Sequence, residues 1–333
     1  MQTKKSRARF FGAALLIGAL IAVAIALPQV FTKKYHTNLM NQCLINIIVV
    51  TGLNFITGMT GQMNMGTAGI FSLGAYTSAL MTTRLGTTPW LGLLGAILMG
   101  CLIGICLGYP SLRLKGVYLS LTTIGFSEVV RIFITNLDDL TGGAVGVTKI
   151  APFQLFGMEI KDNVSVYYLY LAMTAILVVI AWRLARSKWG RAFKAIKDNP
   201  EAMESSGVNI ASLKIMAFTL AAIYGCIGGS LYAHFIRYIN PATYTLDFSI
   251  NYVIMLVIGG LGTVPGGVLG AILVTLTPEL LRFLENYYWF IYSIITLLFV
   301  VFLPNGMASV FARLKGLFVG RIGKGGVANG NRP

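Results

Sequence analysis

The chain has 333 residues, of which 56% are hydrophobic and 11% are charged, whereas soluble domains carry about 25% charged residues. So few charges cannot solvate the surface of a water-soluble particle of this size, and we predict that most of the surface faces lipid. The 26 Lys and Arg outnumber the 11 Asp and Glu, for a net charge of +15. Because no basic segment carries the interleaved aromatic residues of a base-stacking surface, we exclude nucleic-acid binding and expect basic cytoplasmic loops instead.

The four cysteines lie in apolar stretches and form no CxxC pair. Neither a metal site nor a disulfide framework is therefore expected.

The N-terminal residues 1–10 are basic, and a run of apolar residues follows them. This start resembles a signal peptide, but the run is long enough to span a bilayer and ends in Leu27-Pro28-Gln29-Val30, which offers no small-residue cleavage site. We therefore expect a retained first span. Further runs of about 20 apolar residues complete a first set of seven predicted spans, at roughly 11–30, 39–57, 61–82, 88–109, 117–135, 165–183 and 213–236.

Several glycines interrupt the chain at the second and third spans, between Gly58 and Gly66. Small residues let helices approach closely in lipid, and they also let a helix unwind where it lines a cavity. Both explanations stay open. The amides flanking this stretch are candidates to line a path, to cap broken helix ends or to bond neighbouring helices, and they belong to Asn54, Gln62 and Asn64.

Two charged residues, Glu128 and Arg131, stand three positions apart in the fifth span. This spacing allows an intrahelical ion pair, which lowers the cost of two charges in the bilayer. Charges inside a span are also candidates for function, so a gating or interface role remains open.

A polar segment, 184–212, joins the sixth and seventh spans. Asn199 followed by Pro200 indicates a helix N-cap and first turn, and Gly207 indicates its stop. The sequence therefore predicts a short helix beginning at Glu201. A basic loop that only sets topology would not need such a capped helix.

The last apolar region, 247–304, contains a Gly- and Pro-rich stretch that predicts a hinge, formed by Gly259, Gly260, Gly262, Pro265 and Gly266. Loop charges decide the number of crossings. The N-terminus, the segment 184–212 and the tail 305–333 are basic and predicted to be cytoplasmic, whereas the loop 136–164 is richer in acidic residues and predicted to be outside. With both ends inside, this region crosses three times, at 247–260, 264–283 and 287–304.

The predicted fold class is thus all-α, a polytopic transmembrane bundle of about ten spans within residues 11–304. The basic, Gly-rich tail at 305–333 is expected to be flexible. Ten spans divide into two units of five with opposite orientation, as in the inverted repeats of many transporters. This 5+5 arrangement is a hypothesis from topology alone.

Motifs throughout the chain resemble one family. Glu201-Ala202-Met203 followed by Gly207 is similar to the E-A-A-x-x-x-G loop of ABC-importer permeases, with Met203 in place of the second Ala. The longer string around it resembles the branched-chain amino-acid permeases of the LivM type. Similar motifs recur in order from about residue 40 to 305, at Gly58–Gly66, Leu114–Arg131, Leu140–Gly146 and Gly259–Gly267.

The resemblance implies that the cytoplasmic helix docks onto an ATPase. The residues it assigns to this coupling are Gly190, Arg191, Ala192, Asn199, Pro200, Glu201, Ala202 and Gly207. The implied partners are a sister permease, two ATPase subunits and an external binding protein that delivers the amino acid. ATP and Mg²⁺ would sit on the ATPases, since this chain has no G-x-x-x-x-G-K-[ST] phosphate loop.

Other functions remain open. Similar permeases import urea or short amides instead of leucine, isoleucine and valine. A self-contained, ion-coupled carrier is a further alternative, although it would not need the helix at Glu201. A membrane enzyme would require a cluster of catalytic side chains, and the sequence shows none. We therefore expect no enzymatic activity and no bound cofactor or metal.

Overall fold

The computed structural model describes residues 28–29, 34–114, 116–155, 158–160, 162–281, 287–302 and 306–307. Nearly all of the first predicted span and of the tail lie outside these residues. The inverted-repeat hypothesis, which needs that first span, stays a prediction.

The elements are α2 (Lys34–Leu53), η1 (Asn54–Met59), α3 (Thr67–Thr83), α4 (Pro89–Ser111), α5 (Val117–Asn136), α6 (Asp138–Thr141), β1 (Val147–Thr148), β2 (Gln154–Leu155), β3 (Met158–Glu159), α7 (Asn163–Arg186), α8 (Lys188–Asp198), α9 (Pro200–Ser205), α10 (Ile210–Ile236), β4 (Tyr238–Ile239), η2 (Pro241–Thr243), α11 (Leu246–Gly259), α12 (Val264–Leu280) and α13 (Tyr288–Phe302).

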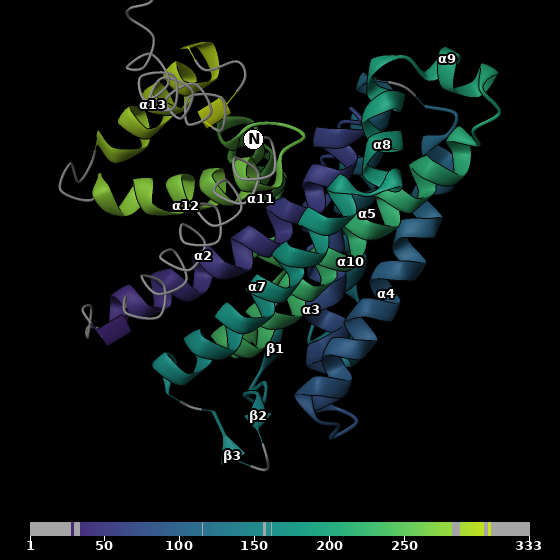
Figure 1. Cartoon of the computed structure of the whole chain (residues 1–333). Coiled ribbons are helices and arrows are strands. Elements are labelled where there is room, and N and C mark those ends of the chain that lie inside the picture. Colours follow the sequence, from purple (N-terminus) through teal and green to yellow (C-terminus); the bar gives the residue numbers. More distant parts are fainter. Residues whose placement is uncertain are drawn as a thin grey trace, which may run out of the picture.

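The protein is an all-α polytopic bundle (Figure 1). Five helical stretches in the described residues are long and apolar enough to cross a membrane: α2 with η1, α4, α5, α7 and α10. The remaining predicted spans in this part of the chain coincide with α3, α11, α12 and α13, which are apolar and have 14 to 17 residues.

Helix α10 lies at the centre, against α2, α3 and α4. Glycines allow this close approach. A Cβ atom on Gly104 of α4 would lie 2.3 Å from the Cα atom of Thr219, and one on Gly74 of α3 would lie 2.3 Å from the Cα atom of Cys226. Tight packing therefore explains many of the glycines within the spans.

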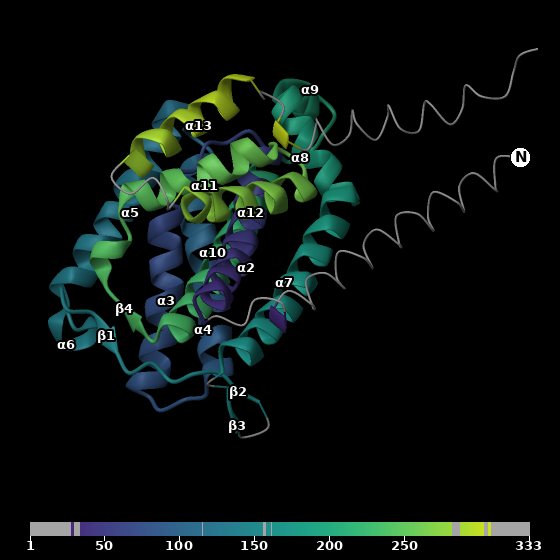
Figure 2. The same cartoon turned by 90° about the vertical axis from the view of Figure 1, so that its left-hand side faces the viewer.

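The two ends of the bundle differ. Helices α8 and α9 lie at one end, which we call the α9 end, and the short strands lie at the other (Figures 1 and 2). There β1 pairs antiparallel with β4, and β2 pairs antiparallel with β3. The predicted cytoplasmic segment 184–212 and the predicted outside loop 136–164 are thus at opposite ends, as the loop charges indicate.

The largest difference from a predicted boundary is at the start of the third span. The third span was expected to begin at 61, but α3 begins at Thr67. Residues 61–66 are not helical, and Gly61 has a φ of +72°, which a right-handed helix does not allow. The interruption near Gly58–Gly66 is therefore real, with a π-helix, η1, before it.

Candidate functional site

The first half of the polar segment, α8, belongs to the body of the protein. Ser187 caps its start by accepting a hydrogen bond from the backbone N–H of Trp189. Its buried residues Gly190, Phe193 and Ile196 share one face, and α8 packs against α7, α10 and η1. Of the predicted coupling residues here, Gly190 is thus a packing residue.

Gly190 sits at the corner between α7 and α8. A Cβ atom at this position would lie 2.3 Å from the carbonyl oxygen of Ala185, so only glycine fits without moving the backbone. Arg191 is exposed and Ala192 is half-buried.

The second half, α9, is capped at both ends. The side-chain oxygen of Asn199 accepts from the backbone N–H of Ala202 at 3.0 Å, and Pro200 is the first helical residue. Gly207 has a φ of +76°, and its N–H donates to the carbonyl of Glu204 at 2.9 Å. The N–H of Val208 donates to the carbonyl of Met203, which completes a Schellman motif. The predicted helix, cap and stop are confirmed.

None of the residues of α9 is buried, and both Glu201 and Ala202 are exposed. A helix of six residues is too short to be stable alone in water. Its two caps and its attachment to α8 therefore hold a rigid polar projection away from the bundle (Figure 1).

One lysine connects this segment to the interrupted helix. The Nζ atom of Lys197, near the end of α8, donates to the carbonyl of Gly58 in η1 at 3.2 Å. The side chain also covers the turn that follows, because a Cβ atom on Gly61 would lie 3.0 Å from the Cγ atom of Lys197. The last carbonyl groups of a helix have no partner within it. Gly58 lies in the last turn of η1, and the ammonium group satisfies its carbonyl.

The same interruption contacts the predicted hinge. The side-chain oxygen of Asn54 accepts from the backbone N–H of Gly262 at 2.9 Å. A Cβ atom on Gly58 would lie 2.6 Å from that nitrogen atom. Two glycine-rich breaks, about 200 residues apart in the sequence, thus meet at the α9 end of the bundle, and Lys197 lies beside them.

The hinge itself is a tight corner between α11 and α12. A Cβ atom on Gly259 would lie 2.0 Å from the carbonyl oxygen of Gly266, and Gly260 and Gly262 have positive φ values. Pro265 stands in the first turn of α12 and is exposed. The hydrogen bond from the hinge to Asn54 comes from Gly262 and not from Pro265, which has no N–H.

The start of α3 is capped by neighbouring side chains. Asn64 accepts from the N–H of Gly66 at 2.7 Å, Ser249 from that of Ala68 at 2.8 Å, and Ser127 from that of Gly69 at 2.9 Å. These bonds satisfy donors that a helix end would otherwise leave unpaired in lipid. Asn64 therefore caps a broken helix end.

Gln62 lies inside the interruption, and neither of its side-chain polar atoms has a partner among the described residues. The Nδ2 atom of Asn54 is likewise buried and unpaired there. Such groups are costly unless a partner satisfies them.

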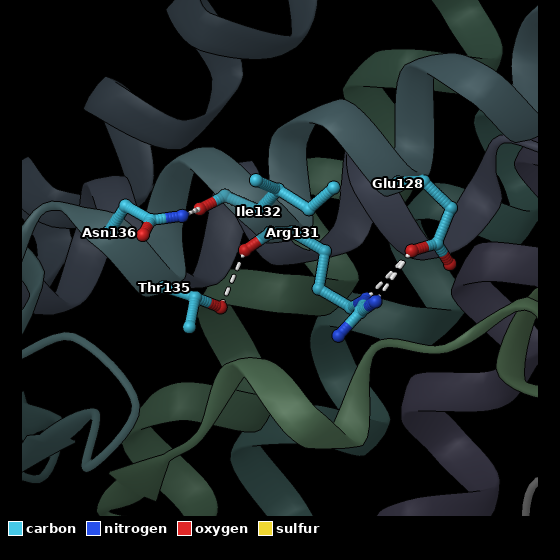
Figure 3. Close-up of polar contacts among 5 residues, drawn as sticks. All are labelled: Glu128, Arg131, Ile132, Thr135 and Asn136. Carbon is cyan, nitrogen blue, oxygen red and sulfur yellow. Dashed lines mark hydrogen bonds and ion pairs between the residues drawn. The ribbon is translucent and has the colours of Figure 1, made fainter.

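Glu128 and Arg131 lie on α5, on a separate side of the protein. Figure 3 shows the guanidinium group of Arg131 reaching back along the helix to the carboxylate of Glu128. The Nε and Nη2 atoms of Arg131 contact the same oxygen, Oε2, at 2.9 Å and 2.7 Å. The predicted intrahelical pair is confirmed, and the two side chains are 35% and 36% exposed.

Sequence reasoning missed Lys197 and Ser127 as contact residues. Lys197 counted only as one positive charge of a basic segment, and nothing marks which lysine reaches η1. Ser127 directly precedes Glu128 and points about 100° away from it around the helix, toward Gly69 of α3. Among the described residues, no cluster of His, Cys, Asp or Glu could hold a metal ion.

Apolar spans, glycine-rich breaks and a rigid polar helix at one end define a polytopic membrane transport protein. The profile of a family described as "Branched-chain amino acid transport system / permease component" matches residues 35–303. The chain belongs to this family.

Several named relatives support the assignment. The high-affinity branched-chain amino acid transport system permease protein LivM of Salmonella typhimurium is 30% identical over 316 residues, covering 88% of this chain and 74% of the relative. LivM of Escherichia coli K12 is 31% identical with the same coverage. The fructose import permease protein FrcC of Rhizobium meliloti is 23% identical and covers 86% of this chain and 82% of the relative. No solved structure matches.

Proposed function

We propose that this chain is one permease subunit of an ATP-binding-cassette importer that carries leucine, isoleucine and valine across a bacterial inner membrane. Identity to the two LivM proteins is 30% and 31%, whereas it is 23% to the fructose permease and 27% to the galactose permease MglC of Haemophilus influenzae. The higher identity favours amino acids over sugars as the substrate class.

The observation that carries ATP coupling is α9, a helix capped at both ends with no buried residue. A permease that hydrolyses no ATP itself needs a rigid element on which a separate ATPase acts, and this chain has no phosphate loop. Two ATPase subunits would bind ATP and Mg²⁺. A sister permease and an external binding protein complete the assembly, and both termini of this chain face the cytoplasm.

The contacts of Lys197 suggest how motion passes into the membrane. A push on α9 moves α8, since the two are joined through Asn199. Lys197 bonds α8 to Gly58, and Asn54 of the same π-helix bonds to Gly262 at the α11–α12 corner. The backbone is already irregular at η1 and at the α11–α12 corner, so it can bend there without breaking the hydrogen bonds of a regular helix. We infer that ATPase movement changes the angle between α2 and the α11–α12 hairpin.

Reconstitution into proteoliposomes tests the proposal. The chain with its sister permease, both ATPases and the binding protein should take up leucine when ATP is supplied, and omission of the ATPases should abolish uptake. Uptake driven by a proton or sodium gradient in the chain alone would overturn it in favour of a secondary carrier. Competition by urea or short amides, without competition by leucine, would reassign the substrate.

A further inference from the structure

Three spans at the periphery of the bundle differ in what they expose. Over most of its length, α4 exposes only apolar residues. They include Leu91, Leu94, Leu98, Leu102 and Ile105. Between Ser165 near its start and its basic end, α7 also exposes apolar residues, such as Ile176, Val179 and Ile180. Both faces suit lipid.

Helix α5 exposes a different surface. Its exposed side carries apolar residues too, but polar and small residues stand among them and the Glu128–Arg131 pair flanks them. The exposed residues from Tyr118 to Phe133 are Tyr118, Leu121, Thr122, Gly125, Val129, Ile132 and Phe133. The opposite side of α5 packs on α3 and the residues before it, where Ser127 accepts from Gly69 and Thr123 accepts from Met65. One face of α5 thus mixes apolar groups, a hydroxyl and both signs of charge.

The charges lie deep in the span. At 1.5 Å per residue, Glu128 has roughly 16 Å of helix on one side and roughly 12 Å on the other, so it lies well inside a hydrocarbon layer about 30 Å thick. Charged groups at this depth almost always face a bundle interior or a water-filled cavity. The outward face of α5 therefore does not face lipid in the assembled transporter.

The ion pair leaves one hydrogen-bonding atom of each side chain without a partner in the described residues. Both contacts of Arg131 end on Oε2 of Glu128, so Oε1 of Glu128 and Nη1 of Arg131 have no partner within the described residues. Gly125, one turn away, leaves open space, since a Cβ atom there would meet no atom within 4 Å.

We propose that the outward face of α5 lines the substrate path between this chain and its sister permease, and that Glu128 and Arg131 receive the ammonium and carboxylate groups of a zwitterionic α-amino acid. This inference rests on the proposed function and adds a site to it. The carboxylate of Glu128 matches the ammonium group, the guanidinium group of Arg131 matches the carboxylate in a bidentate manner, and Val129 and Ile132 offer apolar contact to an aliphatic side chain.

The pair suits passage as well as binding. A zwitterion that enters the membrane loses water from two opposite charges, and two opposite fixed charges compensate it. When the amino acid leaves, the two side chains bond each other again, so neither charge is left unpaired. Binding is thus weak enough for release, as transport requires.

Cysteine labelling tests the location of this face. In the complete transporter in membrane vesicles, Gly125→Cys should react with a charged, membrane-impermeant thiosulfonate reagent, and leucine should slow the reaction. Leu98→Cys, on the exposed face of α4, is the matched control and should not react. Equal reactivity at the two positions, or none at Gly125→Cys, would overturn the path assignment.

Removal of both charges tests their role. The double variant Glu128→Gln/Arg131→Met should lower leucine uptake at least about tenfold, measured on purified complexes that contain every subunit. If the pair had only a structural role, uptake would be unchanged, because the double replacement leaves no unpaired charge in the membrane. Unchanged uptake would therefore overturn the inference. If the wild-type complex took up no branched-chain amino acid, the proposed function would fail separately, and the labelling would still decide whether α5 lines an aqueous path.

Discussion

Helices α8 and α9 are neighbours in one polar segment, yet they use their surfaces in opposite ways. Helix α8 buries Gly190, Phe193 and Ile196 and holds η1 through Lys197. Helix α9 buries no residue and is stabilised by its caps. Helix α8 is therefore part of the permease body, whereas α9 offers the surface on which we propose that the ATPase acts, so substitutions in the two helices should fail in different ways.

The largest expected effect is on α8. Phe193 is fully buried, and Phe193→Ala should lower the free energy of unfolding by about 3–5 kcal/mol. Thermal unfolding in detergent measures this. Trp189→Ala on the same helix is the control, because Trp189 is 42% exposed, and a similar loss in both variants would contradict the burial of one face only.

A smaller loss of stability is expected at the α7–α8 corner. Gly190→Ala places a methyl group against the backbone of Ala185 and should cost about 1–3 kcal/mol. Lys194→Ala, at an exposed position of the same helix, should leave the unfolding midpoint unchanged. A Gly190→Ala protein as stable as wild type would show that the corner is looser than the structure indicates.

The link between the helices and the membrane should affect coupling more than stability. Lys197→Met keeps the apolar stem but removes the donor to Gly58, a loss of about 1 kcal/mol. We expect fewer amino-acid molecules transported per ATP hydrolysed, by a factor of about five. Lys194→Met removes a charge from the same helix without that bond, and equal coupling in the two variants would exclude a role for the contact.

The smallest effect is expected at the cap of α9. Asn199→Ala removes the acceptor for the N–H of Ala202 and should destabilise the short helix by about 1 kcal/mol. Hydrogen exchange of the α9 amides should speed up while the bundle is unaffected. Asn199→Asp retains an acceptor and should behave as wild type.

Much of the fold was predictable because the strongest signals are local. Apolar runs located every long apolar helix in the described residues, and Asn199, Pro200 and Gly207 marked the ends of α9. The start of α3 was missed because Gly61 permits either helix or turn, and tertiary contacts from Ser127 and Ser249 decide the outcome.

The candidate site was predictable only in part. The segment 184–212 was found from its caps and its resemblance to a family motif. The meeting of Asn54 with Gly262, and of Lys197 with Gly58, joins residues far apart in sequence. No spacing rule reports such contacts, because they depend on how α2, α8 and the α11–α12 hairpin pack together.

We propose that α9 transmits ATPase movement without supporting the fold. The direct test is binding-protein-stimulated ATPase activity and leucine uptake of the reconstituted transporter with Glu201→Arg or Gly207→Trp, both at exposed positions. We expect both variants to reach the membrane with a normal unfolding midpoint, while uptake and stimulated hydrolysis are lost. Unchanged uptake in both variants would contradict it.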